Sequence, residues 1–544
     1  MKKLKTSWGI FVLVLVLITS ILACTTHGGG RGVTETADVI VIGAGGAGFA
    51  AAMAAHQGGS SVILLESMNR PGGNTMIAGG AFQSVNPTLQ SQLAMTDAHR
   101  AAIMALVNKP PHDNFERDLQ QTVRKQLEEF TAANRPGLFD SVEWHALQSY
   151  NAGDYIGTPE LVMTLTSNLP PTREWMTTNG MQWSTNPNIN VRIFTVLGGL
   201  WQRSNRPEMP LGTGFIDMGV RYVEANSDRI TLHLETRATE FIVENGRVTG
   251  VRATGPGGDR NFMATRGVVL ATGGFGANVE MRQRYNDMGN PPLWGPGLRN
   301  ALSTNHPGTT GDGIMMAESI GANLVGMEWI QMLPMGDPRT GSLSGNIEMG
   351  VEDRFFVNKN GDRFMDEGGR RDYMTNALLA QPDSWMWVIC DAQSYPDPVN
   401  NRNNFGETIV QLVEAGRAFQ ADTIEELARL IDVPPANLRR AVDEFNAGVA
   451  AGTDRFGRSL WRIRIDQPPF YAGARIPTVH HTMGGVEINN NAQVINTAGR
   501  VIPGLFAAGE VTGGIHGTNR VGGNALADIF VFGRIAGTNA AAVR

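Results

Sequence analysis

The chain has 544 residues, of which 42% are hydrophobic and 18% charged, and its net charge is −6. This composition is typical of a globular protein, and the weak negative charge offers no field for nucleic acid, so we exclude nucleic acid as a partner. Glycine is abundant, at 66 residues, which predicts many places where backbone approaches a ligand, as a large bound cofactor would require.

The first 24 residues have the pattern of an export signal. Lys2, Lys3 and Lys5 precede an apolar run over residues 8–23, which ends at Cys24. Residues 21–24 resemble a bacterial lipobox, in which the cysteine becomes the lipidated N-terminus. We therefore expect residues 1–24 to be a lipoprotein signal peptide and residues 25–36 a flexible tether, with the protein exported and anchored to the cell membrane, facing periplasm or exterior. An ordinary signal peptide and an uncleaved membrane anchor are the alternatives.

The only other cysteine is Cys390, so the mature protein has no pair for a disulfide. Cys390 lies in an apolar run over residues 385–390, which predicts a buried strand. The sequence contains no C-x-x-C-H motif, so no c-type haem is expected.

Residues 37–65 predict a strand–helix–strand unit. Residues 37–42 are a short β-branched run, residues 43–48 a glycine loop, residues 49–56 an Ala-rich helix, and residues 61–65 a second strand.

Helices and strands alternate through the rest of the chain. Helical patterns cover residues 88–130 and 158–179, and residues 230–254 alternate as strands do, with turns at Asn245-Gly246 and at residues 255–258. Apolar strands at residues 267–272 and 504–508 also stop at glycines. Three strands that end in glycine loops favour an open sheet with its ligand at the carboxyl ends of the strands.

The first glycine loop has the G-x-G-x-x-G spacing of a dinucleotide site. Gly43, Gly45, Gly46 and Gly48 lie between a strand and a helix, so that backbone N–H groups can face a pyrophosphate. Glu66 follows the second strand, where a carboxylate can bind the ribose hydroxyls of an adenine nucleotide. A plain glycine turn and a surface acid are the alternative.

A second glycine loop, over residues 70–80, follows that acid, and NAD enzymes do not need it. With residues 268–276 and 504–510, it resembles the FAD fold of the fumarate reductase and succinate dehydrogenase flavoprotein superfamily. The resemblance implies non-covalent FAD. Its further cofactor-binding residues would be Gly73, Asn74, Thr75, Gly79, Gly80, Thr272, Gly273, Gly274, His481, Gly509, Glu510, Asn524, Ala525 and Leu526.

The C-terminal segments 479–485 and 513–524 resemble the soluble, periplasmic fumarate reductases of the flavocytochrome c type. This implies an α/β fold with a discontinuous, Rossmann-like FAD-binding domain, residues 37–325 and 480–544, and an inserted α+β capping domain, residues 326–479. It also implies a structural cation, expected to be Na⁺, held by oxygens of Thr482, Met483, Gly484, Glu510 and Thr512.

The same resemblance implies a reaction. In that family a hydride passes from flavin N5 to the β-carbon of an α,β-unsaturated carboxylate, and an arginine protonates the α-carbon. Arg371 matches that arginine, while His480 and Arg520 match the residues that hold one substrate carboxylate.

The cap departs from the fumarate pattern. Leu333 replaces a histidine that would help to hold a second carboxylate, and Asn346, Ile347 and Gly350 stand where a proton relay would lie. The cap is thus closer to the urocanate reductase branch, in which an acid relays the proton, and Glu348 is at the matching distance before Arg371; a surface carboxylate is the alternative for Glu348. We expect a urocanate-like or related acid as substrate, with cinnamate-like and methacrylate-like acids open.

Three alternatives share these motifs: a fumarate reductase proper, a ketosteroid dehydrogenase, and a lipid-anchored FAD protein that acts as a sensor without turnover. The carboxylate-binding residues argue against the steroid enzyme. Since neither a haem motif nor an acceptor motif for covalent flavin occurs, we expect a separate membrane or periplasmic electron donor.

Overall fold

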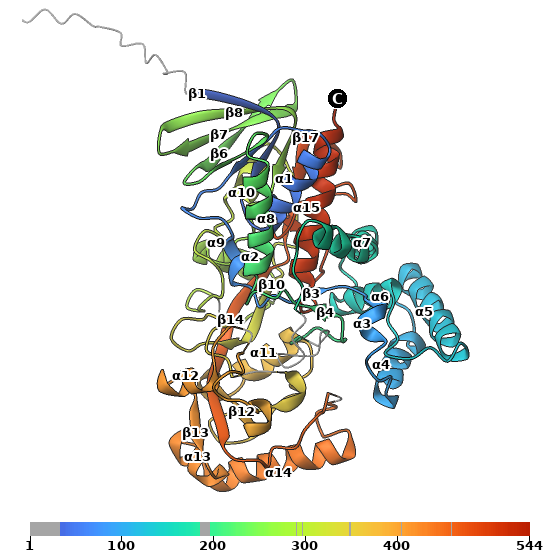
Figure 1. The fold of residues 1–544 in the computed structure, drawn as a ribbon, viewed down its shortest axis with the longest axis vertical. Coiled ribbons are helices and arrows are strands. Elements are labelled where there is room, and N and C mark those ends of the chain that lie inside the picture. Colours follow the sequence, from blue (N-terminus) through green and yellow to red (C-terminus); the bar gives the residue numbers. More distant parts are fainter. Residues whose placement is uncertain are drawn as a thin grey trace, which may run out of the picture.

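The computed structural model describes residues 33–184, 196–289, 291–295, 298–347, 350–403, 405–458 and 460–544. The upper part of the molecule in Figure 1 contains the largest sheet, and the lower part contains a second, smaller one. Among the described residues, no helix is both long and apolar enough to cross a membrane.

The largest sheet has the strand order β16-β17-β8-β1-β2-β5, and the five strands from β17 to β5 run parallel. Its inner strands are continuous apolar runs, buried on both faces, as parallel sheets covered by helices require. The strands of this sheet are β1 (Val33–Ile42), β2 (Val62–Leu65), β5 (Ile230–His233), β6 (Arg237–Glu244), β7 (Arg247–Gly255), β8 (Gly258–Leu270), β16 (Gln493–Ile495) and β17 (Val501–Ala507).

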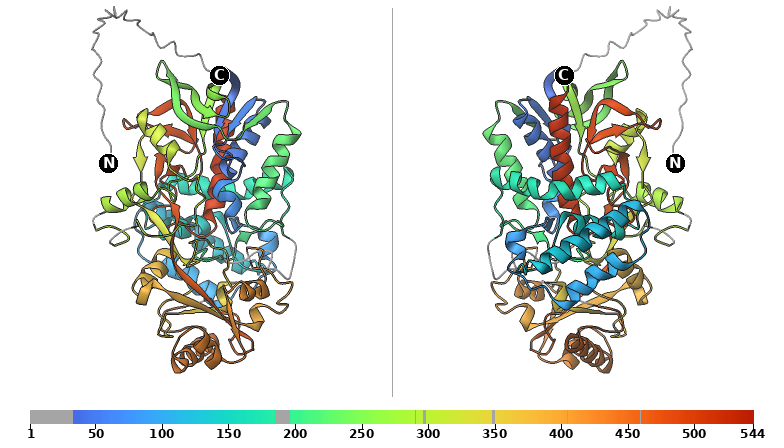
Figure 2. Two further views of the ribbon diagram at one scale, coloured as in Figure 1. Left: turned by 90° about the vertical axis from the view of Figure 1, so that its left-hand side faces the viewer. Right: turned by 90° about the vertical axis from the view of Figure 1, so that its right-hand side faces the viewer.

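Two helices from opposite ends of the sequence lie side by side against this sheet: α1 (Gly46–Gln57) and α15 (Asn524–Ala542) (Figures 1 and 2). Their close approach depends on Gly533 and Gly537, since a Cβ on Gly537 would lie 2.1 Å from the Ala51 carbonyl oxygen. The Ala-rich α1 is therefore buried on all sides, between the sheet, α15 and α8 (Thr213–Ala225).

A helical lobe stands beside this part of the molecule (Figure 1). It contains α4 (Asp97–Asn108), α5 (Asn114–Ala132) and α6 (Val142–Ala152), and α7 (Pro159–Thr178) packs against α6. Its buried side chains form an apolar cluster of their own, centred on Trp144 and Leu147.

The second sheet has the order β10-β14-β12-β11, with β13 also paired to β14. Its strands are β10 (Ile330–Gly336), β11 (Phe355–Val357), β12 (Met386–Asp391), β13 (Phe419–Ala421) and β14 (Phe470–Thr482), and its helices are α11 (Arg371–Leu379), α12 (Ile409–Glu414), α13 (Ile424–Leu430) and α14 (Pro435–Ala451). Strand β14 runs from this sheet up to the larger part of the molecule (Figure 1), and the predicted boundary at residues 479 and 480 lies within it.

Shorter elements connect these layers. They are α2 (Gly73–Ile77), β3 (Phe82–Gln83), α3 (Pro87–Gln90), β4 (Ser204–Asn205), α9 (Val279–Met288), α10 (Asp312–Ser319), β9 (Leu324–Val325), η1 (Val351–Asp353), η2 (Pro382–Ser384), η3 (Ala392–Ser394), β15 (Gly485–Glu487) and β18 (Thr512–Gly513).

The predicted α/β class with a parallel sheet is confirmed. Cys390 lies in β12 and is buried, as expected. Strand β1 begins at Val33, so the sheet includes the last four residues of the predicted tether, which pair with β8. The predicted signal peptide and the rest of the tether lie outside the described residues.

Candidate active site

The parallel strands of the larger sheet end at one level. The register pairs Ile42 with Leu65 on one side and with Leu270 on the other, and pairs Leu270 with Ala507. Glu66 and the glycine loops of three strands therefore follow at the same sheet edge, which is where open α/β sheets bind their ligands.

A cavity of about 490 Å³ starts at this edge and continues to the second sheet. Most predicted cofactor residues line it: Gly43, Gly45, Gly46, Glu66, Gly73, Asn74, Thr75, Gly79, Gly80, Thr272, Gly273, His481, Glu510, Ala525 and Leu526. We call the part lined by the glycine loops after β1, β2 and β8 the glycine end.

The first loop is shaped by glycine backbone. Gly43 has φ +101°, and a Cβ there would lie 2.4 Å from the Ala271 carbonyl oxygen. Helix α1 starts at Gly46, whose N–H donates to Thr75 Oγ1 at 3.1 Å. The loop thus brings the N-terminus of a buried helix to the cavity wall, where N–H groups and the helix dipole favour an anion.

Glu66 closes the loop as well as lining the cavity. Its Oε2 accepts from the Ala44 N–H at 2.9 Å, and its Oε1 from the Met68 N–H at 2.9 Å. The carboxylate is therefore fixed by backbone at the end of β2.

Four predicted cofactor residues lie behind the wall. Gly48, Gly274 and Gly509 pack against neighbouring segments, so that a Cβ on Gly274 would lie 2.0 Å from Thr482 Oγ1. Asn524 contacts His145 Nε2 at 3.0 Å and Ser149 Oγ at 3.1 Å, away from the cavity, because α6 supplies polar partners for the start of α15.

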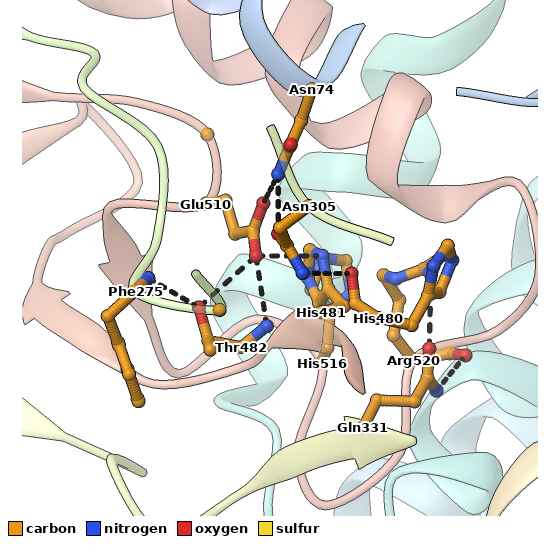
Figure 3. A network of polar contacts seen from close by, with 12 residues as sticks. Asn74, Phe275, Asn305, Gln331, His480, His481, Thr482, Glu510, His516 and Arg520 are labelled. Carbon is orange, nitrogen blue, oxygen red and sulfur yellow. Dashed lines mark hydrogen bonds and ion pairs between the residues drawn. The ribbon is translucent and has the colours of Figure 1, made fainter. Parts of the chain in front are cut away.

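A polar network connects the glycine end to β14 (Figure 3). Glu510 accepts from the Thr482 N–H at 3.0 Å, from Thr482 Oγ1 at 3.2 Å and from Asn74 Nδ2 at 3.3 Å. Burial raises the pKa of Glu510 above its ordinary value despite these bonds. His481 Nδ1 lies 3.5 Å from Glu510 Oε1, and burial, followed by the charge of Arg520, lowers the pKa of His481 well below its usual value.

The predicted cation ligands are spread around this network. Thr482, Met483 and Gly484 are consecutive at the end of β14, and the Thr512 hydroxyl donates to the Gly509 carbonyl at 2.8 Å. Within the described residues, no group of three or more histidines, cysteines or carboxylates is placed to hold a metal. The predicted set relies instead on hydroxyl and carbonyl oxygens with Glu510, and it stays a prediction.

The opposite part of the cavity is lined by Arg371, His480 and Arg520, and Gln331 contacts both arginines there; we call this part the arginine end. Arg371 begins α11, His480 lies on β14, and Arg520 lies in the loop before α15. Gln331 on β10 joins the two arginines, since its Oε1 accepts from Arg371 Nη1 at 3.2 Å and from Arg520 Nη2 at 3.0 Å.

The arginine end carries positive charge, and no acid within the described part of the chain is in contact with it. Among the described residues, neither guanidinium forms an ion pair with a carboxylate, and Arg520 Nε is buried without a hydrogen-bond partner. Burial lowers the pKa of Arg520 to about 10, and burial together with the charge of Arg520 lowers the pKa of Arg371 well below its usual range. Such a cluster is suited to bind an anion.

His480 is neutral in this setting. Burial, then the charges of Arg371 and Arg520, lower its pKa well below the ordinary value for histidine. Its Nδ1 lies 2.9 Å from Thr304 Oγ1, which leaves its other nitrogen for a ligand.

Apolar side chains cover the wall beside the arginines. Leu197, Leu333, Met335, Leu343 and Phe405 line it, and the polar residues Ser342, Ser344 and Asn346 line the cavity in the same region. Ile347 is buried in the core of the second sheet, and Glu348 lies outside the described residues.

Comparisons with known proteins place these features in a family. A family model described as an FAD binding domain matches residues 38–134 and 130–526. The NADH:acrylate oxidoreductase of Vibrio harveyi is 38% identical over 93% of this chain and 50% of its own length. The urocanate reductase of Eggerthella lenta is 34% identical over 94% of this chain and 76% of its own.

The open conformation of a flavocytochrome c3 fumarate reductase superposes with a TM-score of 0.65, at 32% identity over 93% of this chain and 78% of that one. The chain belongs to this FAD-dependent flavoprotein oxidoreductase family. It spans half the length of the Vibrio relative and about three quarters of the other two.

The glycine end of this flavoprotein fits FAD. A Cβ on Gly73 or Gly79 would meet nothing within 4 Å, so these loops border open space, and the Thr272 hydroxyl is buried without a hydrogen-bond partner among the described residues. Both features are expected of a cradle for a large polar cofactor.

Several residues at the site of the flavoprotein are not predicted from its sequence. Gln331, which joins the two arginines, is one of them, although a single amide in an apolar strand is a signal that could indicate it. Leu197, Thr304 and His306 line the cavity, but they lie in loops without a motif.

Proposed function

We propose that this flavoprotein reduces the C=C bond of an α,β-unsaturated carboxylic acid, urocanate-like or related, whose carboxylate binds at the arginine end. The observation that carries the proposal is the meeting of Arg371 and Arg520 at Gln331 Oε1 in the same cavity as the glycine end. Two buried guanidiniums with no acid in contact among the described residues favour the binding of an anion between them.

Arg520 and His480 would hold the substrate carboxylate. Arg520 Nε has no acceptor among the described residues, and the neutral His480 has one ring nitrogen left after its contact with Thr304. Donors aimed at this carboxylate withdraw electron density from the adjacent double bond and so favour attack at its β-carbon.

Arg371 would deliver the proton. Bound FAD would supply a hydride for the β-carbon, and the α-carbon would take a proton, so that the acid gains two hydrogens in total. The lowered pKa of Arg371, caused by burial and then by Arg520, makes the guanidinium a better acid than it is in water. We propose Glu348 as the acid that returns a proton to Arg371, on its position in the sequence alone.

The apolar wall favours an acid with one carboxylate. Leu333, Met335 and Phe405 offer no donor to a second carboxylate, and an unmatched buried charge is strongly disfavoured. Two relatives are named for acrylate and urocanate, which are both monocarboxylates.

The deciding experiment is anaerobic reoxidation of the dithionite-reduced holoenzyme by acrylate, methacrylate, cinnamate, urocanate and fumarate, followed by flavin absorbance. We expect reoxidation by at least one monocarboxylate, and a loss of about 10²–10⁴-fold in rate for Arg371→Ala. Arg439→Ala is the control, because Arg439 forms an ion pair with Glu425 within the second sheet's helices. If no acid reoxidised the flavin, a sensor function would replace the proposal.

We also propose that Cys24 anchors the exported protein and that a separate donor at the membrane reduces it. The support is the charged and apolar pattern of residues 2–24, which lie outside the described part of the chain. Cys24→Ser should move the protein from the membrane fraction to the soluble fraction, and an unchanged distribution would contradict the anchor.

A structural Na⁺ at Thr482, Met483, Gly484, Glu510 and Thr512 is a further proposal, supported by the hard oxygen donors of this set. Replacing Na⁺ by choline at constant ionic strength should lower the melting temperature, and Glu510→Gln should abolish that difference.

A further inference from the structure

Two adjacent arginines have opposite surroundings. Arg371 lines the cavity and donates to the Leu197 carbonyl and to Gln331. Arg370 instead donates to Asp154 through two parallel bonds, Nη1 to Oδ1 at 2.7 Å and Nη2 to Oδ2 at 2.9 Å. Arg370 also contacts Asp372, at 2.8 Å. The residue before the proposed proton donor is therefore fixed to a carboxylate in a distant part of the chain.

Asp154 lies in the short loop between α6 and α7, and it has a second partner. The Thr518 hydroxyl donates to Asp154 Oδ2, and the Thr518 N–H donates to the Gly153 carbonyl at 3.1 Å. Thr518 lies two residues before Arg520. One carboxylate thus joins the segment that carries Arg371 to the segment that carries Arg520.

The loop is held at this place by close backbone packing. A Cβ on Gly517 would lie 2.1 Å from the Gly153 carbonyl oxygen, so the two segments touch directly. Asp154 and Tyr155 have φ of +53° and +65°, a left-handed conformation that non-glycine residues rarely adopt.

The helical lobe supports this turn. The Tyr155 ring stacks on His112 with centroids 4.5 Å apart, and its hydroxyl accepts from Asn151 Nδ2 at 2.5 Å. Lys109 Nζ contacts the same hydroxyl and forms an ion pair with the buried Glu116. The lobe therefore fixes the position of Asp154 rather than leaving it in a free loop.

We propose that Asp154 is a positioning residue that sets the places of Arg371, through Arg370, and of Arg520, through Thr518. This inference rests on the proposed function. The Asp154 side chain is 47% exposed and that of Arg370 15%, so their ion pair adds little to global stability. Its effect is on geometry, to which catalysis is far more sensitive than folding.

The two connections predict different kinetic effects. Arg370→Gln loosens the proton donor and should lower kcat about 10- to 100-fold with little change in KM. Thr518→Val loosens the carboxylate-binding arginine and should mainly raise KM. Asp154→Ala should change both.

The assay uses the full-length holoenzyme, with reduced methyl viologen as donor and the best acid from the reoxidation series. Glu425→Ala is the matched control, because Glu425 also binds one arginine through two bonds, both of 2.9 Å, but far from the cavity. It should leave kcat and KM unchanged while shifting the melting temperature as little as Asp154→Ala does.

The inference would be overturned if Asp154→Ala had wild-type kcat and KM. It would also be overturned if Arg370→Gln and Thr518→Val changed kcat and KM in the same way. Inactivity of the wild-type protein with every acid would instead overturn the proposed function. Amide hydrogen exchange separates the two, since Asp154→Ala should accelerate exchange in α11 and in residues 514–520, and Glu425→Ala should not. Unchanged exchange would refute the positioning role regardless of turnover.

Discussion

The glycine end of the cavity is built from backbone, whereas the arginine end is built from side chains. At the glycine end, loops after three parallel strands bring N–H groups and bare Cα atoms to the wall. At the arginine end, Arg371, His480 and Arg520 come from three separate segments; the two arginines meet at Gln331, and His480 contacts Thr304.

This difference predicts two kinds of sensitivity. A wall made of backbone tolerates most substitutions of neighbouring side chains. It is distorted where a glycine is replaced and the new Cβ would clash with an adjacent backbone segment. Where the wall is made of side chains, a variant should fold normally and lose only the binding or catalytic contribution of the substituted group. Mutations at the two ends should therefore separate cofactor content from turnover.

Among the variants that compare the two ends, the largest effect is expected for Arg520→Gln. Removing this guanidinium deletes the proposed main partner of the substrate carboxylate, which should cost about 3–4 kcal/mol, or about 10²–10³-fold in kcat/KM. The FAD content per chain, measured after denaturation, should stay at the wild-type value. A variant that lost FAD in parallel with activity would contradict the separation of the two ends.

Gly43→Ala should have the next largest effect, on the cofactor. An alanine there combines an unfavourable φ of +101° with a Cβ 2.4 Å from the Ala271 oxygen, and we expect a loss of about 2–4 kcal/mol in stability, with a reduced FAD content. Gly59→Ala is the control, since its φ is +83° but no atom lies within 4 Å of the new Cβ. Equal FAD losses in both variants would show that the unfavourable φ alone causes the loss, and that the contact between the new Cβ and the Ala271 oxygen does not contribute.

The sequence anticipates the two ends unequally, for a physical reason. The loop at Gly43 and the acid at Glu66 are local features, determined by strand, turn and helix signals within thirty residues, and the structure places both at the wall. The turns at Asn245-Gly246 and at residues 255–258 follow from the same local rules and are confirmed.

Long-range side-chain partners are harder to predict. Asn524 turns to His145, 379 residues earlier, and Gln331 acquires its role only when β10 meets the loop of Arg520. The start of β1 at Val33 is a similar case. Its first residues are polar and predict a flexible tether, but they form a strand because they pair with β8. The identities of Arg371, His480 and Arg520 came from a family resemblance, and their convergence required the tertiary structure.

Leu333→His tests the apolar wall with a smaller expected effect. A donor at this place could contact a second carboxylate, so the ratio of kcat/KM for fumarate to that for methacrylate should rise about tenfold. Leu333→Met, which keeps volume and polarity, should leave the ratio unchanged. A histidine variant that lost both activities in proportion would show that Leu333 does not determine specificity.

The smallest expected effect is on the pH dependence of stability, through His145, which contacts Asn524 at the start of α15. Burial, then the charge of Arg203, lowers the pKa of His145 well below its usual 6.5. The His145 ring therefore stays neutral in the folded protein at pH values where it takes up a proton in the unfolded chain. Stability is therefore full above pH 6.5 and declines as the pH falls below it, by about 1 kcal/mol between pH 7 and 5.5 for this one residue. In urea unfolding, His145→Gln should reduce the pH dependence by that amount, whereas Gln148→Asn, on the same helix, should lower stability equally at both pH values. An unchanged slope in His145→Gln would mean that the pKa of His145 is the same in the folded and unfolded states, and that burial does not keep this ring neutral.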